Sequence, residues 1–393
     1  MGVKKLRETE TTTLDSLPEI PLLEILSYLD AKHAVETSMI SRSWSFLWTL
    51  VPDLNFSSDS FKQLHVFDNF VIKVLSNRQP VQLRRLTFKR GGTCNAQMVK
   101  KVFDYAFLHG VKELEASIGY TIYNQGIWMW PIWSSDSLTS LKLVSKYAAG
   151  CPFLQPRSGS FKNLTSLHLV WVIIRDLDPF SGFPELDKLR LVRCYLATNG
   201  QALNVHALQL SEFTFVYCSQ DVGHCEFTTP KLRYFKWKGS GLPQLKAHFP
   251  VLDTGVINSN GRSGKNQEKM EFDNLLMMFD TLQAAKSITL SAHVVRLLAL
   301  FPVNGCCSPF RDLRFLKLDF KVHHIYIDEI DSKLFFSETL QLVPGVKAYL
   351  LHESPHAKCT IINYPKGESP CSTDWPICSE PTQTHLVSGL ISK

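Results

Sequence analysis

Long apolar runs are absent from this sequence. A bilayer-spanning helix needs roughly 18 to 20 consecutive apolar residues, whereas the longest apolar runs here, such as residues 169–174, have the length of a strand. The N-terminal segment MGVKKLRETETTT is polar and lacks the apolar core of a secretory signal. We therefore expect no membrane partner and an intracellular protein, cytoplasmic, nuclear or both.

Cysteine pairs with the spacing of metal or redox motifs are also missing. None of the ten cysteines forms a CxxC pair. Cys218, His224 and Cys225 are close in sequence, but their spacing does not suit a zinc finger and no second pair follows nearby. We expect free, buried thiols, no metal and no cofactor.

Catalytic motifs are absent as well. The sequence has no GxSxG elbow, no phosphate-cradling glycine-rich loop and no HExxH pair. The excess of positive over negative charge is also small, because 42 basic and 36 acidic residues leave a net charge of only +6 over 393 residues. These features predict a protein that is not an enzyme and that does not bind nucleic acid. The 45% of apolar residues is enough for a globular chain of two or three domains.

Residues 15–56 are the most informative stretch, DSLPEIPLLEILSYLDAKHAVETSMISRSWSFLWTLVPDLNF. The stretch opens on a Leu-Pro pair and continues with a short apolar helix. A second helix is expected to begin near Asp30, and two tryptophans close the stretch. A module of about 40 residues cannot bury so many large apolar side chains alone, so the stretch predicts a surface that a partner covers.

This stretch resembles an F-box, specifically the plant form that is followed by leucine-rich repeats. The resemblance implies docking onto a Skp-type adaptor protein, which links to a cullin scaffold. The implied adaptor-binding residues are Leu17, Pro18, Leu22, Ile25, Leu26, Val35 and Trp44. The alternative is that such residues pack only on each other and on the repeats, as we expect for Leu47 and Trp48.

The stretch departs from the family pattern at Asp30, His33, Glu36 and Ser43, where the family usually has Pro, an acidic residue, a basic residue and Arg. Asp30 is still suited to cap the second helix through its carboxylate. Whether the changed charges at Glu36 and Ser43 weaken adaptor binding stays open. None of the four departures touches the apolar contacts.

A second pattern, three apolar residues spaced as in LxxLxL, recurs from residue 83 onward. The last apolar residues of its nine instances are Phe88, Ala116, Leu143, Leu169, Leu191, Phe215, Trp237, Leu290 and Leu318. Successive instances lie 22–28 residues apart, except for one gap of 53 residues. We interpret that gap as two periods, with either Leu245 or residues 251–257 in the missing repeat. This spacing is typical of leucine-rich repeats, whose LxL residues alternate on a short strand and point into a shared core.

The two patterns together predict an α/β fold, a helical F-box followed by an irregular leucine-rich-repeat solenoid. We expect parallel strands, with helices or loops on the convex side. The predicted order is flexible N-terminus, F-box, linking helix, solenoid and poorly ordered tail, at residues 1–13, 14–57, 58–80, 81–365 and 366–393.

Two further segments qualify this scheme. The polar residues 258–269 predict an exposed loop that interrupts the solenoid, and residues 270–285 predict a helix with one apolar face. The sequence Asp374-Trp375-Pro376 resembles the opening of the FBD domain that many relatives carry at the C-terminus. Because the chain ends soon afterwards, we expect that domain to be truncated or absent.

Three tryptophans, Trp128, Trp130 and Trp133, fall within six residues. They are candidate target-binding residues, because tryptophan is a frequent hot spot of protein interfaces. The alternative, that they pack against a neighbouring repeat, is favoured by their alternation with Ile127 and Met129.

The resemblance implies a substrate-recognition subunit of an SCF-type ubiquitin ligase, which binds an unidentified target protein through its repeats. One alternative is a small-molecule or hormone co-receptor of the same broad type, and another is an interaction scaffold without ligase function. A receptor pocket needs convergent cations, but the basic residues near the strands suggest no common register. These are Lys142, Arg190, Arg193, Arg233, Lys236 and Lys238.

Overall fold

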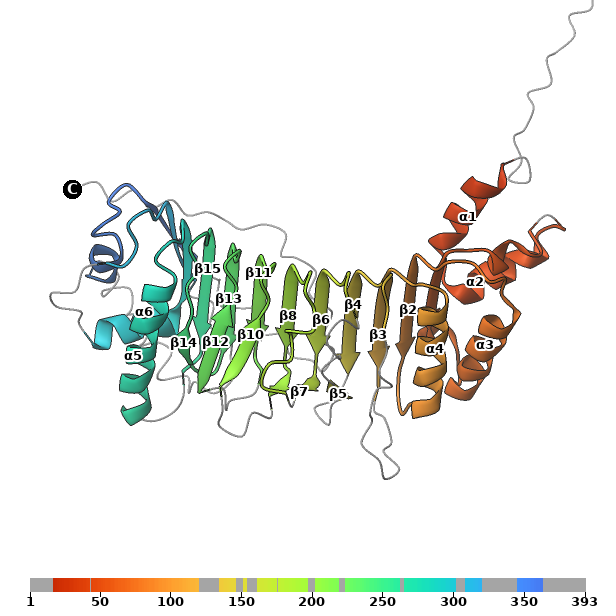
Figure 1. Cartoon of the computed structure of the whole chain (residues 1–393), viewed down its shortest axis with the longest axis horizontal. Helices are drawn as coiled ribbons and strands as arrows, with labels where there is room; N and C mark the ends of the chain where they lie inside the picture. Colours follow the sequence, from red (N-terminus) through yellow and green to blue (C-terminus); the bar gives the residue numbers. More distant parts are fainter. Residues whose placement is uncertain are drawn as a thin grey trace, which may run out of the picture. The chain divides into compact units, whose positions relative to one another are not determined.

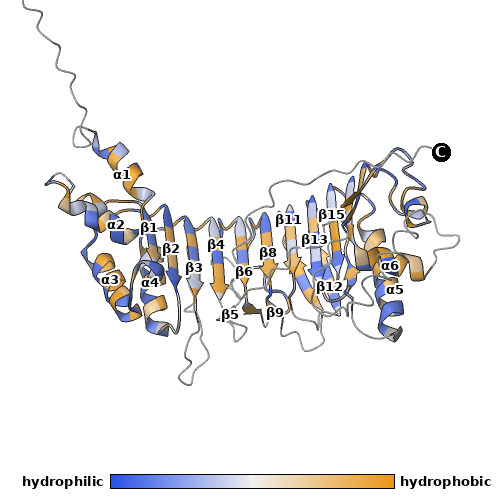
Figure 2. Cartoon of the chain, turned by 180° about the vertical axis from the view of Figure 1, so that it is seen from behind, coloured by the Kyte–Doolittle hydropathy of each residue, from blue (hydrophilic) through white to orange (hydrophobic). Residues whose placement is uncertain are grey.

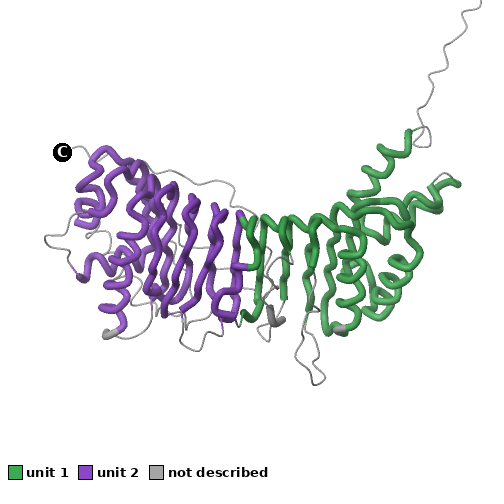
Figure 3. The backbone as a smooth tube through the Cα atoms, viewed as in Figure 1, with its two compact units in different colours: residues 1–175, 182–186 green, residues 176–181, 187–393 purple. Residues whose placement is uncertain are grey.

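The protein is described by a computed structural model, which divides the chain into two compact units (Figure 3). Unit 1 comprises Met1–Arg175 and Gly182–Leu186, and unit 2 comprises Asp176–Ser181 and Asp187–Lys393. The structure describes residues 17–42, 44–119, 134–145, 151–153, 161–174, 176–196, 202–218, 223–261, 265–301, 308–319 and 345–362. Candidates Trp128, Trp130 and Trp133, and the segments 1–13 and 366–393, lie outside these residues.

Unit 1 begins with short helices, as the sequence predicts (Figure 1). Asp30 precedes the second of them and caps it. The linking helix predicted within 58–80 is α3, which buries Phe67, Val71 and Val74 at helical spacing. The elements are α1 (Glu19–Ser27), α2 (Ala31–Glu36), the 3-10 turns η2 (Thr37–Met39), η3 (Leu47–Thr49) and η4 (Ser58–Ser60), and α3 (Leu64–Asn77).

A parallel sheet follows in unit 1, with its strands paired in chain order. Its strands are β1 (Asp53–Ser57), β2 (Arg85–Arg90), β3 (Glu113–Ile118), β4 (Ser140–Ser145) and β6 (Ser166–Val170). Helix α4 (Ala96–Leu108) connects β2 to β3 and packs against α3. A second, short parallel pair joins β5 (Cys151–Phe153) to β7 (Val172–Ile174).

Unit 2 repeats this arrangement. Its main sheet is again parallel, and its strands are β8 (Lys188–Val192), β11 (Glu212–Val216), β13 (Tyr234–Gly239), β15 (Thr254–Ser259), β16 (Ser287–Ser291), β17 (Phe315–Asp319) and β18 (Lys358–Ile362). A second parallel layer consists of β10 (Leu203–His206), β12 (His224–Thr228) and β14 (Gln244–Lys246), and β9 (Tyr195–Leu196) is a two-residue strand. Helices α5 (Lys265–Thr281) and α6 (Ala292–Leu300) contact each other near β14, β15 and β16. No helix in the described segments is long and apolar enough to cross a membrane.

The recurring apolar positions fall on strands, one per strand, and share a register. In unit 1, Phe88, Ala116, Leu143 and Leu169 lie side by side on neighbouring strands. In unit 2, Leu191, Phe215, Trp237, Ile257, Leu290, Leu318 and Ile361 do the same. Ile257 therefore occupies this register position within the gap of 53 residues, as the second of the two alternatives, residues 251–257, predicts. Leu245 instead belongs to β14 of the second layer.

Burial alternates along these strands because successive side chains point to opposite faces. On β11 and β13 the buried members are Phe213, Phe215, Phe235 and Trp237. Phe215 and Trp237 stack with ring centroids 3.9 Å apart. Phe213 and Phe235 contact Phe227 of β12, so the aromatic side chains join the main sheet to the second layer. The core of unit 2 is therefore built between these two layers.

The loop predicted at 258–269 is shorter than expected. Strand β15 continues to Ser259, and helix α5 already begins at Lys265. The polar composition misled the prediction, because the charged residues of this first turn pair within the helix and with α6. Lys269 binds Asp273 at 2.8 Å, and Arg296 donates to Glu268 at 2.9 Å.

Phe235 occupies the centre of the aromatic core of unit 2. We expect Phe235→Ala to lower the free energy of unfolding by about 3–5 kcal/mol, because it removes a buried ring in contact with Phe213, Phe227 and Phe249. Urea unfolding followed by circular dichroism measures the change. The matched control is Phe315→Ala on β17, where the ring is 53% exposed and the loss should be far smaller. Equal losses in the two variants would contradict this account of the core.

Candidate protein-interaction site

The N-terminal module has a small apolar core of its own. Leu22 and Leu26 lie four residues apart on α1 and therefore on one face of the helix. They pack with Trp44, Leu47 and Val51, and Leu17, Leu23 and Leu29 close the cluster from outside. Leu22, Leu26 and Trp44, three of the residues implied to bind an adaptor, are thus buried within the module itself.

The seven residues predicted to bind an adaptor separate into three groups. Leu22, Leu26 and Trp44 are only 1–4% exposed, so in this structure they lie beneath the surface. Leu17 and Val35 are half-buried; Leu17 packs against the cluster, whereas Val35 is not a member of it and lines a small gap with Val51, Leu54 and Val74. Pro18 and Ile25 are exposed. The structure therefore brings Leu17, Leu22, Leu26 and Trp44 together but not the whole set.

Other apolar side chains of the module are displayed instead. Six of the sixteen large apolar residues exposed among the described residues fall between positions 20 and 46. They are Ile20, Ile25, Tyr28, Met39, Ile40 and Phe46. Exposed apolar side chains are thus concentrated in this stretch of the sequence. We call these six residues the exposed apolar set.

Sequence reasoning missed five members of this set. Helical periodicity could have predicted two of them. If Leu22 and Leu26 share the buried face of α1, then Ile20 and Tyr28 lie on its exposed side. Met39, Ile40 and Phe46 lie in or beside 3-10 turns, where no regular periodicity separates inside from outside.

Asp30 organises the start of α2. Its carboxylate accepts hydrogen bonds from the backbone N–H of His33 at 2.8 Å and from the Ser60 hydroxyl at 2.9 Å, so the expected cap is confirmed. Burial alone raises the pKa of Asp30, but these hydrogen bonds and the nearby His33 imidazole outweigh it and hold the pKa below its usual value. The departures His33 and Glu36 are exposed, and Ser43 lies outside the described residues.

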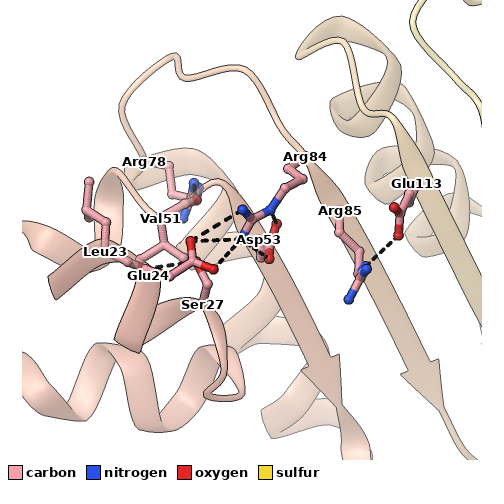
Figure 4. A network of polar contacts seen from close by, with 9 residues as sticks. All are labelled: Leu23, Glu24, Ser27, Val51, Asp53, Arg78, Arg84, Arg85 and Glu113. Carbon is pink, nitrogen blue, oxygen red and sulfur yellow. Dashed lines mark hydrogen bonds and ion pairs between the residues drawn. The ribbon is translucent and has the colours of Figure 1, made fainter. Parts of the chain in front are cut away.

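Arg84 ties α1 to the beginning of the sheet (Figure 4). Its guanidinium binds both oxygens of Asp53, at 2.8 and 2.7 Å, and reaches Glu24 of α1 at 3.2 Å. The hydrogen bonds with Asp53 raise the pKa of Arg84. Since the pairs are partly exposed they contribute little stability, but the two-point geometry orients α1 relative to β1.

Arg78 makes a second tie, after helix α3. It donates to the carbonyl oxygen of Trp48 at 2.8 Å and to that of Val51 (Figure 4). Burial lowers the pKa of Arg78. Because the partners are backbone carbonyls at the end of the module, Arg78 fixes where the module ends and β1 begins.

Among the described residues, no group of three or more His, Cys, Asp or Glu side chains is arranged so that it could hold a metal ion. Of the two cysteines that the sequence places near each other, Cys218 comes two residues after β11, whereas Cys225 lies on β12. Burial raises the pKa of both thiols, which opposes formation of the thiolate that zinc requires.

Removal of the Asp30 cap should destabilise the protein in a pH-dependent way. Asp30→Ala is expected to cost about 1 kcal/mol near neutral pH. A carboxylate with a lowered pKa stabilises the fold above its unfolded pKa, near 3.8, and loses that contribution as pH falls through the lower folded value. The difference between wild type and variant should therefore shrink in acid, as thermal melts across pH will show.

The control for this experiment is Asp59→Ala, at an exposed position near the same turn. It should change stability by only a few tenths of a kcal/mol at any pH. An Asp30→Ala effect that is constant down to strong acid, or no larger than the control, would rule out the capping role.

Comparison with known proteins matches residues 14–55 to the F-box domain. The chain is 28% identical over 295 residues to a putative F-box/FBD/LRR-repeat protein of Arabidopsis thaliana, covering 68% of this chain and 65% of that protein. It is 26% identical to a putative F-box/LRR-repeat protein of the same plant, covering 96% and 85%. An FBD-associated F-box protein is 29% identical, covering 61% and 57%.

The chain thus spans less than two thirds of the length of several of these relatives. The domain match coincides with the module that holds the exposed apolar set, and the wider similarity extends over the strands that follow. The chain thus carries a match to the F-box domain and is similar to plant F-box/LRR-repeat proteins.

Proposed function

We propose that the chain is a substrate-recognition subunit of an SCF-type ubiquitin ligase. The observation that carries the proposal is the coincidence of the F-box match, at residues 14–55, with a cluster of displayed apolar side chains. In this proposal the module docks onto a Skp-type adaptor, through it joins a cullin, and the remaining chain binds a target protein.

The exposed apolar set provides the docking contacts in this proposal. Ile25, which belongs to the predicted adaptor-binding residues, is 42% exposed, and Met39 and Phe46 are 87% and 76% exposed. Burying such side chains against a partner contributes roughly 25 cal/mol per Å² of apolar surface. In this proposal the role of Leu22, Leu26 and Trp44 is indirect, because their packing in the core holds α1 and the last turn of the module in place.

We further propose that the parallel strands are the repeats of a leucine-rich-repeat solenoid, with the F-box at residues 14–57 and the repeats at 81–365. The one-strand-per-period register supports this assignment. Two cysteines also support the assignment. The Cys194 N–H donates to the Cys218 sulfur at 3.3 Å, and the two cysteines stand two positions after Val192 and Val216, which are partners on neighbouring strands. Leucine-rich repeats often carry Asn or Cys after the strand, where it bridges neighbouring repeats.

The proposed mechanism is proximity rather than bond chemistry. A target held on the repeats would present its lysines at high effective concentration to the ubiquitin thioester carried elsewhere in the complex. Such a role needs no nucleophile or general base from this chain.

Adaptor docking can be tested by charging the exposed apolar set without disturbing the core. We expect the double variant Ile25→Asp/Met39→Asp to lose at least about 2 kcal/mol of binding free energy, roughly thirtyfold in affinity, because both side chains become buried at the interface. Calorimetry with a purified plant Skp-type adaptor measures the loss, and circular dichroism verifies the fold.

The matched control is Leu108→Asp at the end of α4, an 81% exposed apolar position outside the F-box match. It should bind the adaptor as wild type does. Undiminished binding by the double variant, or an equal loss in the control, would overturn the docking proposal. Leu22→Asp is a poor test, because that side chain is 4% exposed and the charge would disrupt the module itself.

A further inference from the structure

The outward face of strands β8, β11 and β13 in unit 2 is unusual in composition. Buried residues alternate with less buried ones along these strands, and the colouring of the ribbon by hydropathy alternates with them (Figure 2). Because successive side chains point to opposite faces, the less buried residues share the face opposite to the buried ones. Nine residues occupy outward positions, of which four are basic and one is acidic. The acidic one, Glu212, binds Lys188 at 2.7 Å. The other three basic residues at outward positions are Arg190, Lys236 and Lys238, and a further one, Arg193, follows directly after β8.

These cations share a register that the sequence did not suggest. Arg190 and Lys236 both pair with Thr214 of β11, from its two sides. Lys238 stands one outward position further along β13. The expectation that the basic residues show no common register is therefore wrong for this group, because the register depends on strand pairing and not on distance along the sequence.

The cations are spread over the face rather than gathered at one point. Neighbouring strands lie about 4.8 Å apart, so the backbones of Arg190 and Lys236 are separated by roughly 10 Å. A single phosphate needs several donors converging within hydrogen-bond distance. A row of carboxylates along an extended chain matches spread cations better, since its side chains recur at comparable intervals.

Aromatic side chains stand among the cations. Lys238 Nζ lies 5.0 Å from the centre of the Tyr217 ring, and the Asn260 amide donates to the Tyr217 hydroxyl at 3.4 Å. Tyr234 lies beside Arg190 and Glu212; burial raises the pKa of its hydroxyl, which Arg190 partly offsets. Half-buried tyrosines of this kind offer large contact area with little loss of side-chain entropy.

The backbone holds two of these residues in a conformation that is uncommon for residues other than glycine. Arg193 and Tyr217 have φ angles of 51° and 49°, and their N–H groups donate to Val216 and Lys238 of the next strand at 2.7 and 2.6 Å. The left-handed conformation costs about 1 kcal/mol or more for a bulky residue. A large basic and a large aromatic side chain are thus held at equivalent positions of adjacent repeats.

We propose that this face, comprising Arg190, Arg193, Tyr217, Tyr234, Lys236 and Lys238, binds an extended peptide segment rich in Asp and Glu within a target protein. The inference rests on the proposed function, of which it names the target chemistry. Carboxylates of the segment pair with the four cations, and its backbone lies across the tyrosines and the valine side chains between them. β15, which adjoins β13, has Thr254, Val256 and Asn258 at its outward positions, so this strand adds no carboxylate to the face.

The test uses the full chain and a fluorescein-labelled peptide rich in Asp and Glu, followed by fluorescence polarisation. We expect saturable binding that weakens as salt is raised. Lys236→Glu/Lys238→Glu should weaken it at least about tenfold, because attraction becomes repulsion at two contacts. The matched control Lys246→Glu, on β14 of the second layer and 81% exposed in its side chain, makes the same charge change elsewhere and should leave binding unchanged.

Three further ligands separate the competing explanations. A peptide with Asn and Gln in place of Asp and Glu should not bind, and equal binding would overturn the proposal. Tighter binding of an otherwise neutral peptide with one phosphoserine would show a phosphate site instead, and tighter binding of single-stranded RNA would show a nucleic-acid surface. Undiminished binding by the double lysine variant would refute the assigned face.

Adaptor binding is measured in parallel on the same variants. The double lysine variant should retain it, since both substitutions lie far along the sequence from residues 14–55. Loss of peptide binding with intact adaptor binding supports the inference. Peptide binding without any adaptor binding by the wild type would refute the ligase role while the peptide surface stands.

Discussion

The stacking of each strand on the one before it is the constraint on which the rest of the structure depends. At several strands, the residue before the strand donates its N–H to the carbonyl oxygen of the residue before the preceding strand. In unit 1, Thr139 donates to Lys112 at 2.8 Å and Thr165 to Thr139 at 2.9 Å. In unit 2, Arg233 donates to Ser211 and Asp253 to Arg233 in the same way. Because a slip by one residue would turn every side chain to the opposite face, these bonds fix which side chains are buried and which are displayed.

The N-terminal module follows the same logic on a smaller scale. Its core holds only a few large side chains, so burial of Leu22 and Leu26 leaves Ile25 and Tyr28 without cover on the same helix. Arg84 and Arg78 then join the module to β1 through Asp53 and through the carbonyls of Trp48 and Val51. An exposed apolar surface therefore arises as a consequence of how a short chain packs, and the orientation of the module is held by polar contacts that contribute little to stability.

The sequence was sufficient for features that depend on local spacing. The LxxLxL pattern placed nine strands, and the capping role of Asp30 could be read from its position before a helix. It was insufficient wherever pairing or tertiary burial decides the outcome. Helix α5 begins earlier than its polar residues suggest, because Glu268 and Lys269 find partners on α6 and within the helix. The resemblance implied Leu22 and Trp44 as adaptor contacts, but the structure buries both, and apolar side chains serve in cores and interfaces alike. The shared register of Arg190 and Lys236 is a property of strand pairing that no local pattern contains.

The alternation along each strand separates the residues that the fold needs from those available for recognition. Phe235 and Trp237 supply buried ring contacts, whereas Lys236, between them, contributes nothing to that core. A substitution at the outward position changes the charge of the face without opening a cavity, so its cost to stability is small. A face of this kind can therefore change its charge while the register and the core stay fixed. The basic and tyrosine residues at the outward positions thus set the chemistry of the face, while the buried residues between them set the fold.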